Sequence, residues 1–527
     1  MRKGFNLLLT VVLCGLSLSI ATAQCPPRPS PGTVVQDALN LPSTGGVLSA
    51  NMTMKSSVDG AGYTHYCYIY KTDTGEVESP TLRLNQGDTL VLGIKNRIEG
   101  DDANMSMVMN GSGGSTPVCG DTGTMTVSST NVHYHGLNVP PKCHQDEVVN
   151  TLIQPGTDGF QYKIQIPTDE PPGLYWYHPH IHGFTEFQVN GGAAGALIVE
   201  GMDKIHPQVS GLTERVFVLR QQFLVPWIPG PYQLTLNYEP AVYPNFPSPV
   251  IQMQPNTKEF WRVANATNQD FMPLQVQFNG VAQKVELVAM DGYPLPQTRF
   301  VDTILLPPAS RAEFIVDAPP TGVDASFLTL DYSTGPTGNP DLFQILGNMV
   351  LSTDAPKAPA PKPAQASQPA APPKIKYTGL RDAKVTANRK LFFSEEFAGT
   401  NGPIQFYITV DGQQQKVFEP DEKPAITTKV GAVEDWVIEN HALETHAFHI
   451  HQIHFMLLEV DGKPVANQDL RDTIEVPFWE GPGHPYHKVK VRMDFRDPNI
   501  AGTFVFHCHI LLHEDLGMMH KILVLPQ

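Results

Sequence analysis

Apolar and polar residues alternate along several short stretches of the chain, as they do in half-buried β-strands. Residues 162–166 (YKIQI) and 488–493 (KVKVRM) both follow this pattern. Residues 193–199 (AAGALIV) form a continuous apolar run, which predicts a fully buried strand. Long helical periodicity is absent, and 43 glycines and 48 prolines supply many turns. The pattern predicts an all-β chain of Greek-key β-sandwiches.

Three short segments occur twice, in the same order and at nearly the same spacing, in the last two thirds of the chain. The pairs are FWRVAN at 260–265 with DWVIEN at 435–440, MDGYP at 290–294 with VDGKP at 460–464, and VDTI at 301–304 with RDTI at 471–474. The first third joins through another segment, since 173–178 (GLYWYH) parallels 502–507 (GTFVFH). The chain is therefore predicted to use one β-unit three times.

Length and composition divide the chain into a leader, three domains and a linker. The first residues have a positive start, a short apolar run and a small-residue cleavage site, which predicts a secretory signal. The Pro/Ala-rich stretch from Ala355 to Lys374 cannot build a core and predicts an extended spacer. The expected units are a signal peptide at 1–23, β-sandwich domains at 24–203, 204–353 and 377–527, and a linker at 354–376.

The charge and the cysteines limit the partners and the compartment. A net charge of −16 argues against nucleic acid or an anionic membrane, and no stretch beyond the leader is apolar enough to anchor the chain in a bilayer. Cys25, Cys67, Cys119 and Cys143 allow three pairings, of which we favour Cys25–Cys67 and Cys119–Cys143; free buried thiols are the alternative. We expect a secreted or periplasmic protein.

Ten of the nineteen histidines fall in four motifs, two in the first domain and two in the third. The motifs are His133-Tyr-His135, His178-Pro-His180, His446-Ala-Phe-His449-Ile-His451, and His507-Cys508-His509 followed by His513 and Met518. Residues i and i+2 of a strand point to the same face, so each His-x-His pair can offer two imidazoles to one cluster. Four such pairs offer eight imidazoles, which predicts a metal centre between the two domains.

Cys508 points to the opposite face from His507 and His509, where it can join His446 and His513 in a second site. Two histidines and a cysteine, with a weak methionine such as Met518, are the ligands of a blue electron-transfer copper. Zinc is a poor alternative, because zinc sites rarely need ten ligands and a methionine.

The repeat supplies an internal comparison for these motifs. Phe271, Leu274 and Val276 of the second domain stand where the third has His446, His449 and His451. The second domain should therefore hold no copper. In the first domain Pro179 takes the place of Cys508, so that domain should share the cluster but lack a blue site.

These motifs resemble those of the multicopper oxidases, the family of laccases, ascorbate oxidase and bacterial copper-resistance oxidases. The resemblance covers nearly all of the chain beyond the leader and implies that the three β-sandwich domains are cupredoxin-like. It also implies four copper ions: one type 1, one type 2 and two type 3. By motif, the implied ligands are His446, Cys508, His513 and axial Met518 for type 1, His133 and His449 for type 2, and His135, His178 and His509 with His180, His451 and His507 for the type 3 pair.

The resemblance also implies the chemistry: single electrons enter at the type 1 site, through an exposed edge of His513, and four of them reduce O2 to two water molecules. The expected partners are O2 and a small reducing substrate, with the chain a monomer. Phenols and aromatic amines are the first choice of donor. Cu(I), Fe(II) or Mn(II) is the second, and a non-catalytic copper-binding exported protein is the alternative of another class.

Two acids are candidates for proton handling. Glu514 follows His513, and bacterial relatives with a similar His-Glu-Asp run place a glutamate against the cluster; an acid of a helix start is the alternative. Asp146 lies where relatives have an acid bonded to the type 2 site, with a solvated loop carboxylate as the alternative. His182 is interpreted as structural, with the alternative that it holds a ligand histidine in place. His454, His484 and His487 are interpreted as surface or packing residues, and Met105, Met107 and Met109 as structural, with a metal role as the less favoured interpretation.

Overall fold

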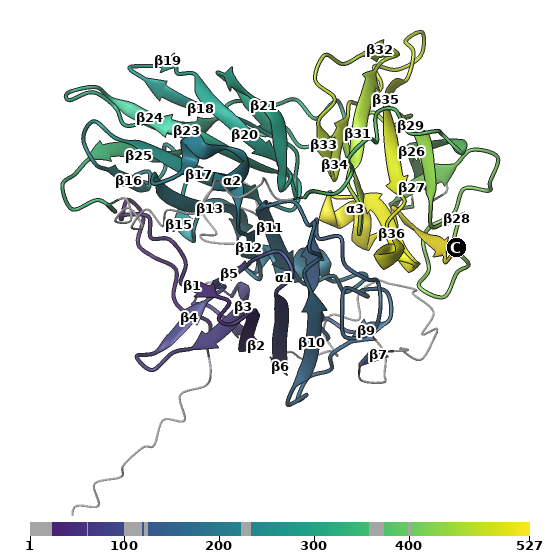
Figure 1. The fold of residues 1–527 in the computed structure, drawn as a ribbon, viewed down its shortest axis with the longest axis horizontal. Helices are drawn as coiled ribbons and strands as arrows, with labels where there is room; N and C mark the ends of the chain where they lie inside the picture. Colours follow the sequence, from purple (N-terminus) through teal and green to yellow (C-terminus); the bar gives the residue numbers. More distant parts are fainter. Residues whose placement is uncertain are drawn as a thin grey trace, which may run out of the picture.

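The computed structural model describes residues 24–60, 62–99, 119–120, 125–222, 233–357, 374–398 and 402–527. The expected signal peptide, the methionines at 105, 107 and 109, and most of the expected linker lie outside these residues. The described part consists of three β-sandwiches around a common junction, which confirms the predicted fold class. In Figure 1 the first (purple to blue) lies below, the second (teal) at upper left and the third (green to yellow) on the right.

The first sandwich has two five-stranded sheets in its described residues. In spatial order, one sheet is β1 (Asn40–Pro42), β5 (Thr81–Leu84), β12 (Gly195–Val199), β11 (Gly173–His178) and β8 (His133–His135). The other is β10 (Phe160–Gln165), β6 (Thr89–Arg97), β2 (Val47–Val58), β3 (Thr64–Lys71) and β4 (Glu76–Glu78). β7 (Cys119–Gly120) and β9 (Thr151–Leu152) form a small separate ladder.

The second sandwich pairs a larger sheet with a smaller one. The larger is β15 (Glu239–Pro240), β14 (Gln233–Leu236), β13 (Thr213–Gln222), β17 (Lys258–Asn265), β23 (Arg311–Asp317), β20 (Val285–Met290) and β21 (Tyr293–Val301). The smaller is β16 (Val250–Met253), β25 (Gln344–Leu351), β24 (Ala325–Thr329), β18 (Met272–Phe278) and β19 (Val281–Ala282), with β22 (Ile304–Leu306) beside β18.

The third sandwich repeats this plan and ends the chain. Its larger sheet is β27 (Ile404–Val410), β26 (Ala387–Phe397), β29 (Ala432–Asn440), β35 (His487–Phe495), β31 (Phe455–Val460) and β32 (Lys463–Pro464), with β33 (Leu470–Arg471) beside β31. Its smaller sheet is β28 (Ile426–Lys429), β37 (Met519–Leu525), β36 (Gly502–Cys508), β30 (His446–Ile450) and β34 (Thr473–Val476).

The helices of the described chain are short and lie between strands. They are α1 (Thr185–Asn190), α2 (Met202–Ile205) and α3 (Leu511–Asp515), with 3₁₀ turns at Pro207–Val209 and Pro498–Ile500. None of the described helices is long and apolar enough to cross a membrane. α1 and α3 meet where the first and third sandwiches touch, because the Asp515 carboxylate accepts the backbone N–H groups of Thr185 and Glu186 at 3.0 and 2.8 Å.

The repeat predicted from the sequence reappears in backbone pairing. β13 lies parallel to β17 in the second sandwich, as β26 does to β29 in the third, and each pair continues antiparallel into β23 or β35. Trp261 and Trp436 occupy the same place in the two units, and each donates its indole N–H to the glutamate two residues earlier, at 2.8 and 2.9 Å. Both bonds lie in the buried centre of a sandwich.

The alternation used to predict strands matches the burial observed. Along β10, buried and exposed residues alternate from end to end. The alternation buries the apolar face of each sheet against its partner, which stabilises a sandwich by about 25 cal/mol for each Å² of apolar surface removed from water. Each sandwich has its own apolar core.

Both favoured disulfides are present. Cys25–Cys67 ties the N-terminal segment to β3, and Cys119–Cys143 joins β7 to the loop that follows the first histidine motif. Cys508 is the free cysteine of the described residues, and it is buried.

Segments at the expected domain boundaries pack across them. Val35, in the stretch assigned to the first domain, donates its N–H to Val250 of the second at 2.9 Å, and Asp37 pairs with Arg215 at 3.0 Å. At the end of the expected linker, Lys376 pairs with Asp169 at 3.0 Å. The N-terminal segment and the end of the linker therefore help to hold neighbouring sandwiches together.

Candidate metal centre

Four strands from two sandwiches carry the histidine motifs to one place. β8 bears His133 and His135, and β11 ends at His178 in the first sandwich. In the third, β30 begins at His446, and β36 ends at Cys508. β11 pairs with β8, and β36 pairs with β30, so the ladders align the motifs within each sandwich.

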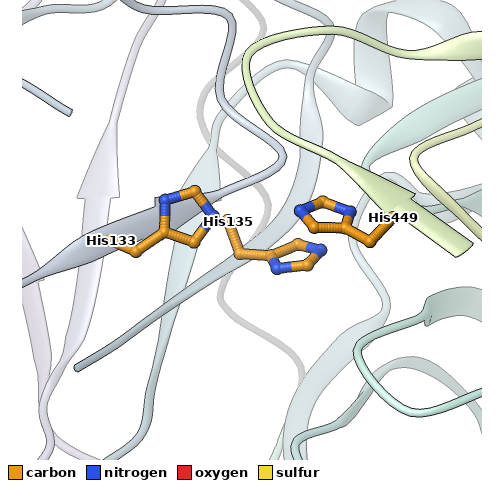
Figure 2. A group of neighbouring side chains, drawn as sticks. All are labelled: His133, His135 and His449. Carbon is orange, nitrogen blue, oxygen red and sulfur yellow. The ribbon is translucent and has the colours of Figure 1, made fainter. Parts of the chain in front are cut away.

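The eight histidines of the paired motifs meet between the first and third sandwiches. Figure 2 shows His133 and His135 of β8 facing His449 of β30. The ring of His135 stacks on that of His449 at 4.0 Å between centroids, and His133 stacks on His451 at 3.8 Å. The eight residues form three groups, and within each group the potential ligand atoms all lie within 4.8 Å of one another. The groups are His133, His135 and His449; His135, His178 and His509; and His180, His451 and His507.

A second site lies on the other face of β36, as the alternation of the strand predicts. The Sγ of Cys508 lies 3.5 Å from His446 Nδ1 and 3.9 Å from His513 Nδ1, and the two nitrogens are 3.3 Å apart. Met518 is fully buried, and its backbone bonds to the backbones of His513 and Cys508 at 2.8 and 3.0 Å. One tripeptide, 507–509, therefore joins the two sites.

Several nitrogens of the eight-histidine cluster lack protein partners. Buried ring nitrogens without a hydrogen-bond partner occur on several of these rings: His133, His135, His178, His449, His451 and His509. In the third group, His507 Nε2 lies 3.2 Å from His451 Nε2 and 3.5 Å from His180 Nε2. Unpaired nitrogens converging in a dry site are unfavourable unless a cation binds them. The donor set therefore fits copper, for which imidazole and thiolate are suitable ligands.

Burial keeps seven of the cluster imidazoles neutral, which metal binding requires. Burial, reinforced by neighbouring imidazoles, lowers the pKa of His178 to about 3. The pKa of His180 falls to about 4, also mainly by burial. Burial likewise lowers the pKa of five further cluster histidines well below the ordinary value: His133, His135, His449, His451 and His509.

Bonds on the outer nitrogens fix the orientation of several rings. His449 Nδ1 donates to the backbone oxygen of Asp472 at 2.8 Å, and His178 Nδ1 donates to that of Pro179 at 2.8 Å. In each ring a proton on Nδ1 leaves the lone pair on Nε2, which is the nitrogen without a partner. The cluster therefore presents lone pairs rather than protons at these positions.

Asp146 is a buried neighbour of the cluster, so the alternative of a solvated loop acid is wrong. Its carboxyl lies 3.0 Å from His133 Nδ1 and accepts the N–H of Tyr134 at 2.9 Å. It also accepts a bond from the side chain of Gln452. Burial raises the pKa of Asp146 to about 8.

Glu514 is fully buried in α3 and faces two cluster histidines. Its carboxylate oxygens lie 3.1 Å from His507 Nδ1 and 3.4 Å from His180 Nε2. Burial alone would raise the pKa of Glu514, but His180 and His507 lower it by more, and the net shift is well below its usual range. Glu514 thus lies beside the cluster, and it is also an acid of the first turn of α3, as the alternative predicted.

The expected exposed edge of His513 is wrong. The residue is only 3% exposed, because the Phe406 ring stacks on it at 4.0 Å and Glu444 covers its Nε2 at 3.7 Å. Glu395 similarly lies 3.3 Å from His446 Nε2. Burial, with Glu395 nearby, raises the pKa of Glu444 to about 8. Sequence reasoning missed both acids, since neither lies in a histidine motif.

The remaining histidines lie apart from the ligand groups. His182 packs edge-on against Phe418, and His484 is exposed. His487 pairs with Asp461 and Glu480 at the surface. His454 is fully buried and donates to the backbone oxygen of Asp291 at 2.7 Å. Their contacts agree with the structural interpretation.

The second sandwich contributes none of the ligand groups found among the described residues. Phe271, Leu274 and Val276, at the places of three histidines, are buried in apolar cores. Phe271 reaches into the core of the third sandwich and stacks on Tyr332. The two units have thus diverged from ligands to packing at equivalent positions.

Comparisons with known proteins agree with this geometry. Three family models, each described as multicopper oxidase, match residues 124–204, 216–341 and 397–527. A multicopper oxidase of Staphylococcus aureus is 25% identical over 465 residues, which cover 85% of this chain and 83% of that protein. A laccase of Haloferax volcanii is 24% identical over 417 residues, covering 75% and 67%.

Solved structures share the fold. A multicopper oxidase from Campylobacter jejuni, described as a metallo-oxidase, superposes with a TM-score of 0.66 at 24% identity, covering 95% of this chain and 96% of the other. McoA from Aquifex aeolicus superposes with a TM-score of 0.65 at 18% identity, covering 95% and 100%.

The chain belongs to the multicopper oxidase family. Members of this family are copper-dependent oxidases that use O2 and a reducing substrate, and this protein is a copper-dependent oxidase. The histidine clusters described above are consistent with a copper requirement.

The lowered histidine pKa values predict how copper uptake depends on pH. Imidazoles that are already neutral have no proton to release, so copper binding to the metal-free folded chain should release nearly the same number of protons at pH 6 as at pH 7.5. Seven ordinary imidazoles with a pKa near 6.5 would add about five protons at the lower pH. Titration in weakly buffered solution measures the difference, and the same chain in urea is the control. A release about five protons larger at pH 6 would contradict the prediction.

Proposed function

We propose that this chain is a laccase-like oxidase with four copper ions, one of type 1, one of type 2 and two of type 3. His446, Cys508 and His513 would hold type 1, with Met518 as its axial ligand. The other three sites would take the eight clustered histidines: His133 and His449 for type 2, and His135, His178 and His509 with His180, His451 and His507 for the type 3 pair. The three groups of converging ligand atoms support this division.

Copper at these sites would supply the redox chemistry, in which four one-electron oxidations of donor are coupled to the reduction of O2, with four protons, to two molecules of water. The observation that carries the proposal is the tripeptide 507–509, whose middle residue belongs to one site and whose ends belong to the other. Cys508 would act as the electron conduit. The His507 Nδ1 bond to the Cys508 carbonyl, at 2.9 Å, adds a second short connection.

The chain's own acids would manage the protons. Glu514 lies against His507 and His180, on the inner side of the cluster, where a carboxylate can accept a proton and pass it on to the site of O2 reduction. Asp146 would orient His133 through its Nδ1.

We further propose that the protein is secreted or periplasmic. The leader expected at 1–23 and the two disulfides support an oxidising compartment.

Phenols and aromatic amines are the proposed donors. Laccases among the relatives support this class.

A metal-ion donor is a second candidate, and one feature favours it. Glu395 and Glu444 lie against the outer nitrogens of His446 and His513, and their side chains keep 11% and 14% exposure. Two partly exposed carboxylates beside the proposed entry point can hold a small cation such as Cu(I), Fe(II) or Mn(II). The solved relative from Campylobacter jejuni is described as a metallo-oxidase, which supports the same class.

Replacing Cys508 with serine tests the function itself. Cys508→Ser removes the thiolate that both colours the type 1 site and connects it to the cluster, so the folded variant should lack the strong visible absorption and should consume O2 with a phenolic donor only at the background rate. Far-ultraviolet circular dichroism serves as the folding control. A variant that stays blue, or that turns over at the wild-type rate, would rule out the assignment.

Replacing Glu444 with glutamine separates the two donor classes. If metal ions enter through the carboxylates, Glu444→Gln should raise the KM for Cu(I) or Fe(II) by about tenfold, equal to about 1.4 kcal/mol of lost binding, and leave the KM for a phenol unchanged. The exposed Glu419→Gln is the matched control. Wild-type KM values for the metal ions in both variants would eliminate the carboxylate route and leave the aromatic donors.

Replacing Glu514 with glutamine tests the proton relay. Glu514→Gln keeps the size of the side chain but cannot release and regain a proton, so reduction of the type 1 site by donor should stay nearly normal while reoxidation by O2 slows by about 10²-fold or more. Stopped-flow mixing of the fully reduced variant with O2 measures the second step. Reoxidation at the wild-type rate across the pH range would remove Glu514 from the relay and make Asp146 the next acid to test.

A further inference from the structure

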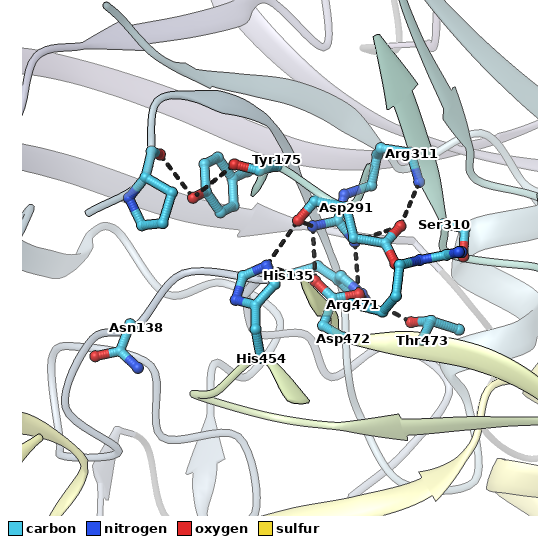
Figure 3. A network of polar contacts seen from close by, with 12 residues as sticks. His135, Asn138, Tyr175, Asp291, Ser310, Arg311, His454, Arg471, Asp472 and Thr473 are labelled. Carbon is cyan, nitrogen blue, oxygen red and sulfur yellow. Dashed lines mark hydrogen bonds and ion pairs between the residues drawn. The ribbon is translucent and has the colours of Figure 1, made fainter. Parts of the chain in front are cut away.

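The second sandwich supplies no ligand group in its described residues, yet it reaches the histidine cluster through a buried ion pair. Arg311, at the start of β23, donates from Nη1 and Nη2 to the two carboxylate oxygens of Asp472 at 2.8 and 2.7 Å. Both residues are fully buried. Figure 3 shows this pair at the centre of a network that joins all three sandwiches.

Asp472 connects the ion pair to two cluster histidines on different sandwiches. Its Oδ1 lies 3.3 Å from Nε2 of His135, and its backbone oxygen accepts from Nδ1 of His449 at 2.8 Å. These two rings stack on each other and belong to one group of converging ligand atoms. The position of one aspartate therefore sets the orientation of a ring from the first sandwich and a ring from the third.

A second ion pair crosses the same interface in the opposite sense. Asp291 of the second sandwich accepts Arg471 Nε at 2.6 Å and the backbone N–H of Arg311 at 2.8 Å. Arg311 Nη2 also donates to the Asp291 backbone oxygen at 2.8 Å. Arg471 and Asp472 are consecutive, so residues of the second sandwich pair with both charges at the junction between β33 and β34.

Gly136 shows how closely the ion pair approaches the first histidine motif. A Cβ at this position would lie 2.4 Å from Arg311 Nη2 and 2.7 Å from Asp472 Oδ2, and the residue has φ +89°. Only glycine fits both the space and the backbone conformation. The absence of a side chain at Gly136, the residue that follows His135, therefore lets the ion pair pack directly against the first histidine motif.

The internal repeat provides a comparison within the same molecule. Asp302 stands in the second sandwich where Asp472 stands in the third, and it is exposed. Asp461 stands where Asp291 stands, and it is also exposed. Only the copies at the histidine cluster are buried, which ties their burial to the site rather than to the β-unit.

We propose that Arg311 is a positioning residue for the histidine cluster, acting through Asp472; this rests on the proposed copper function. The planar guanidinium makes two parallel bonds to one carboxylate, a geometry that a lysine cannot reproduce. It thereby fixes the aspartate that orients His135 and His449. The second sandwich is retained as the support of a cluster for which it supplies no ligand.

Arg311→Gln, compared with Arg262→Gln, tests the proposal. Arg262 is a similarly buried arginine of the same sandwich, and its Nη1 pairs with Glu313. Glu313 also accepts the backbone N–H of Leu174 in the first sandwich, so this ion pair crosses an interface without the link to His135 and His449 that Asp472 provides. Three readouts are taken on copper-loaded protein: copper per chain after dialysis against a chelator, the electron paramagnetic resonance spectrum of the type 2 site, and the visible absorption of the type 1 site.

We expect Arg311→Gln to retain cluster copper about 10- to 100-fold less tightly than wild type, with an altered type 2 spectrum and normal type 1 absorption. Arg262→Gln should behave as wild type in all three. Normal cluster copper and an unchanged type 2 spectrum in Arg311→Gln, or equal losses in Arg262→Gln, would overturn the proposal.

The milder Arg311→Lys covers the case in which the glutamine variant does not fold. It should show the same shift of the type 2 spectrum to a smaller extent, and a wild-type spectrum would again overturn the proposal. Wild-type protein that binds no copper and shows no visible absorption would instead refute the proposed function, so the two failures are distinguishable.

Discussion

Eight buried imidazoles turn their nitrogens toward one another where the first and third sandwiches meet, and this convergence constrains the rest of the structure. The dry site favours the neutral form of a ring, but several of the ring nitrogens have no protein partner. An interior that leaves polar atoms unpaired is destabilised by about 1–3 kcal/mol for each of them unless a ligand satisfies them. The surrounding protein must therefore hold the rings against the tendency to find other partners.

Two kinds of contact provide that restraint. Ladders within each sandwich align the motifs, since β8 pairs with β11 and β30 with β36. Hydrogen bonds between sandwiches then align the ladders. Asp515 accepts backbone N–H groups in the first turn of α1, and Asp472 bonds to the imidazoles of His135 and His449, which belong to different sandwiches. Burial alone would raise the pKa of Asp472, but Arg311 lowers it below its ordinary value. The aspartate therefore stays ionised, and can accept hydrogen bonds, at a buried position that disfavours charge.

The fold and the convergence of the histidine motifs were predictable because both depend on the local spacing of residues. Alternation identified the strands, and the two-residue period placed Cys508 on the opposite face from its histidine neighbours. The repeat predicted apolar residues such as Leu274 at ligand positions. Contacts between residues distant in sequence were not predictable: Arg311 meets Asp472 only because two sandwiches dock, and Glu444 covers His513 through a loop outside every motif. The exposed edge expected for His513 failed for the same reason.

The second sandwich illustrates how one unit can take different tasks. Its tryptophan and glutamate repeat the bond made in the third sandwich, so the common core was kept. At the ligand positions, side chains such as Phe271 fill apolar space instead. The second sandwich is more than a spacer, because it places the buried charges of Arg311 and Asp291 at the interface with the third sandwich. Asp302, which is equivalent to Asp472 in the repeat, is instead exposed to solvent. Because a histidine cluster shared by two domains has no single scaffold, a third domain bound to both can fix the angle between them. A bidentate ion pair does so with directional bonds that apolar packing lacks.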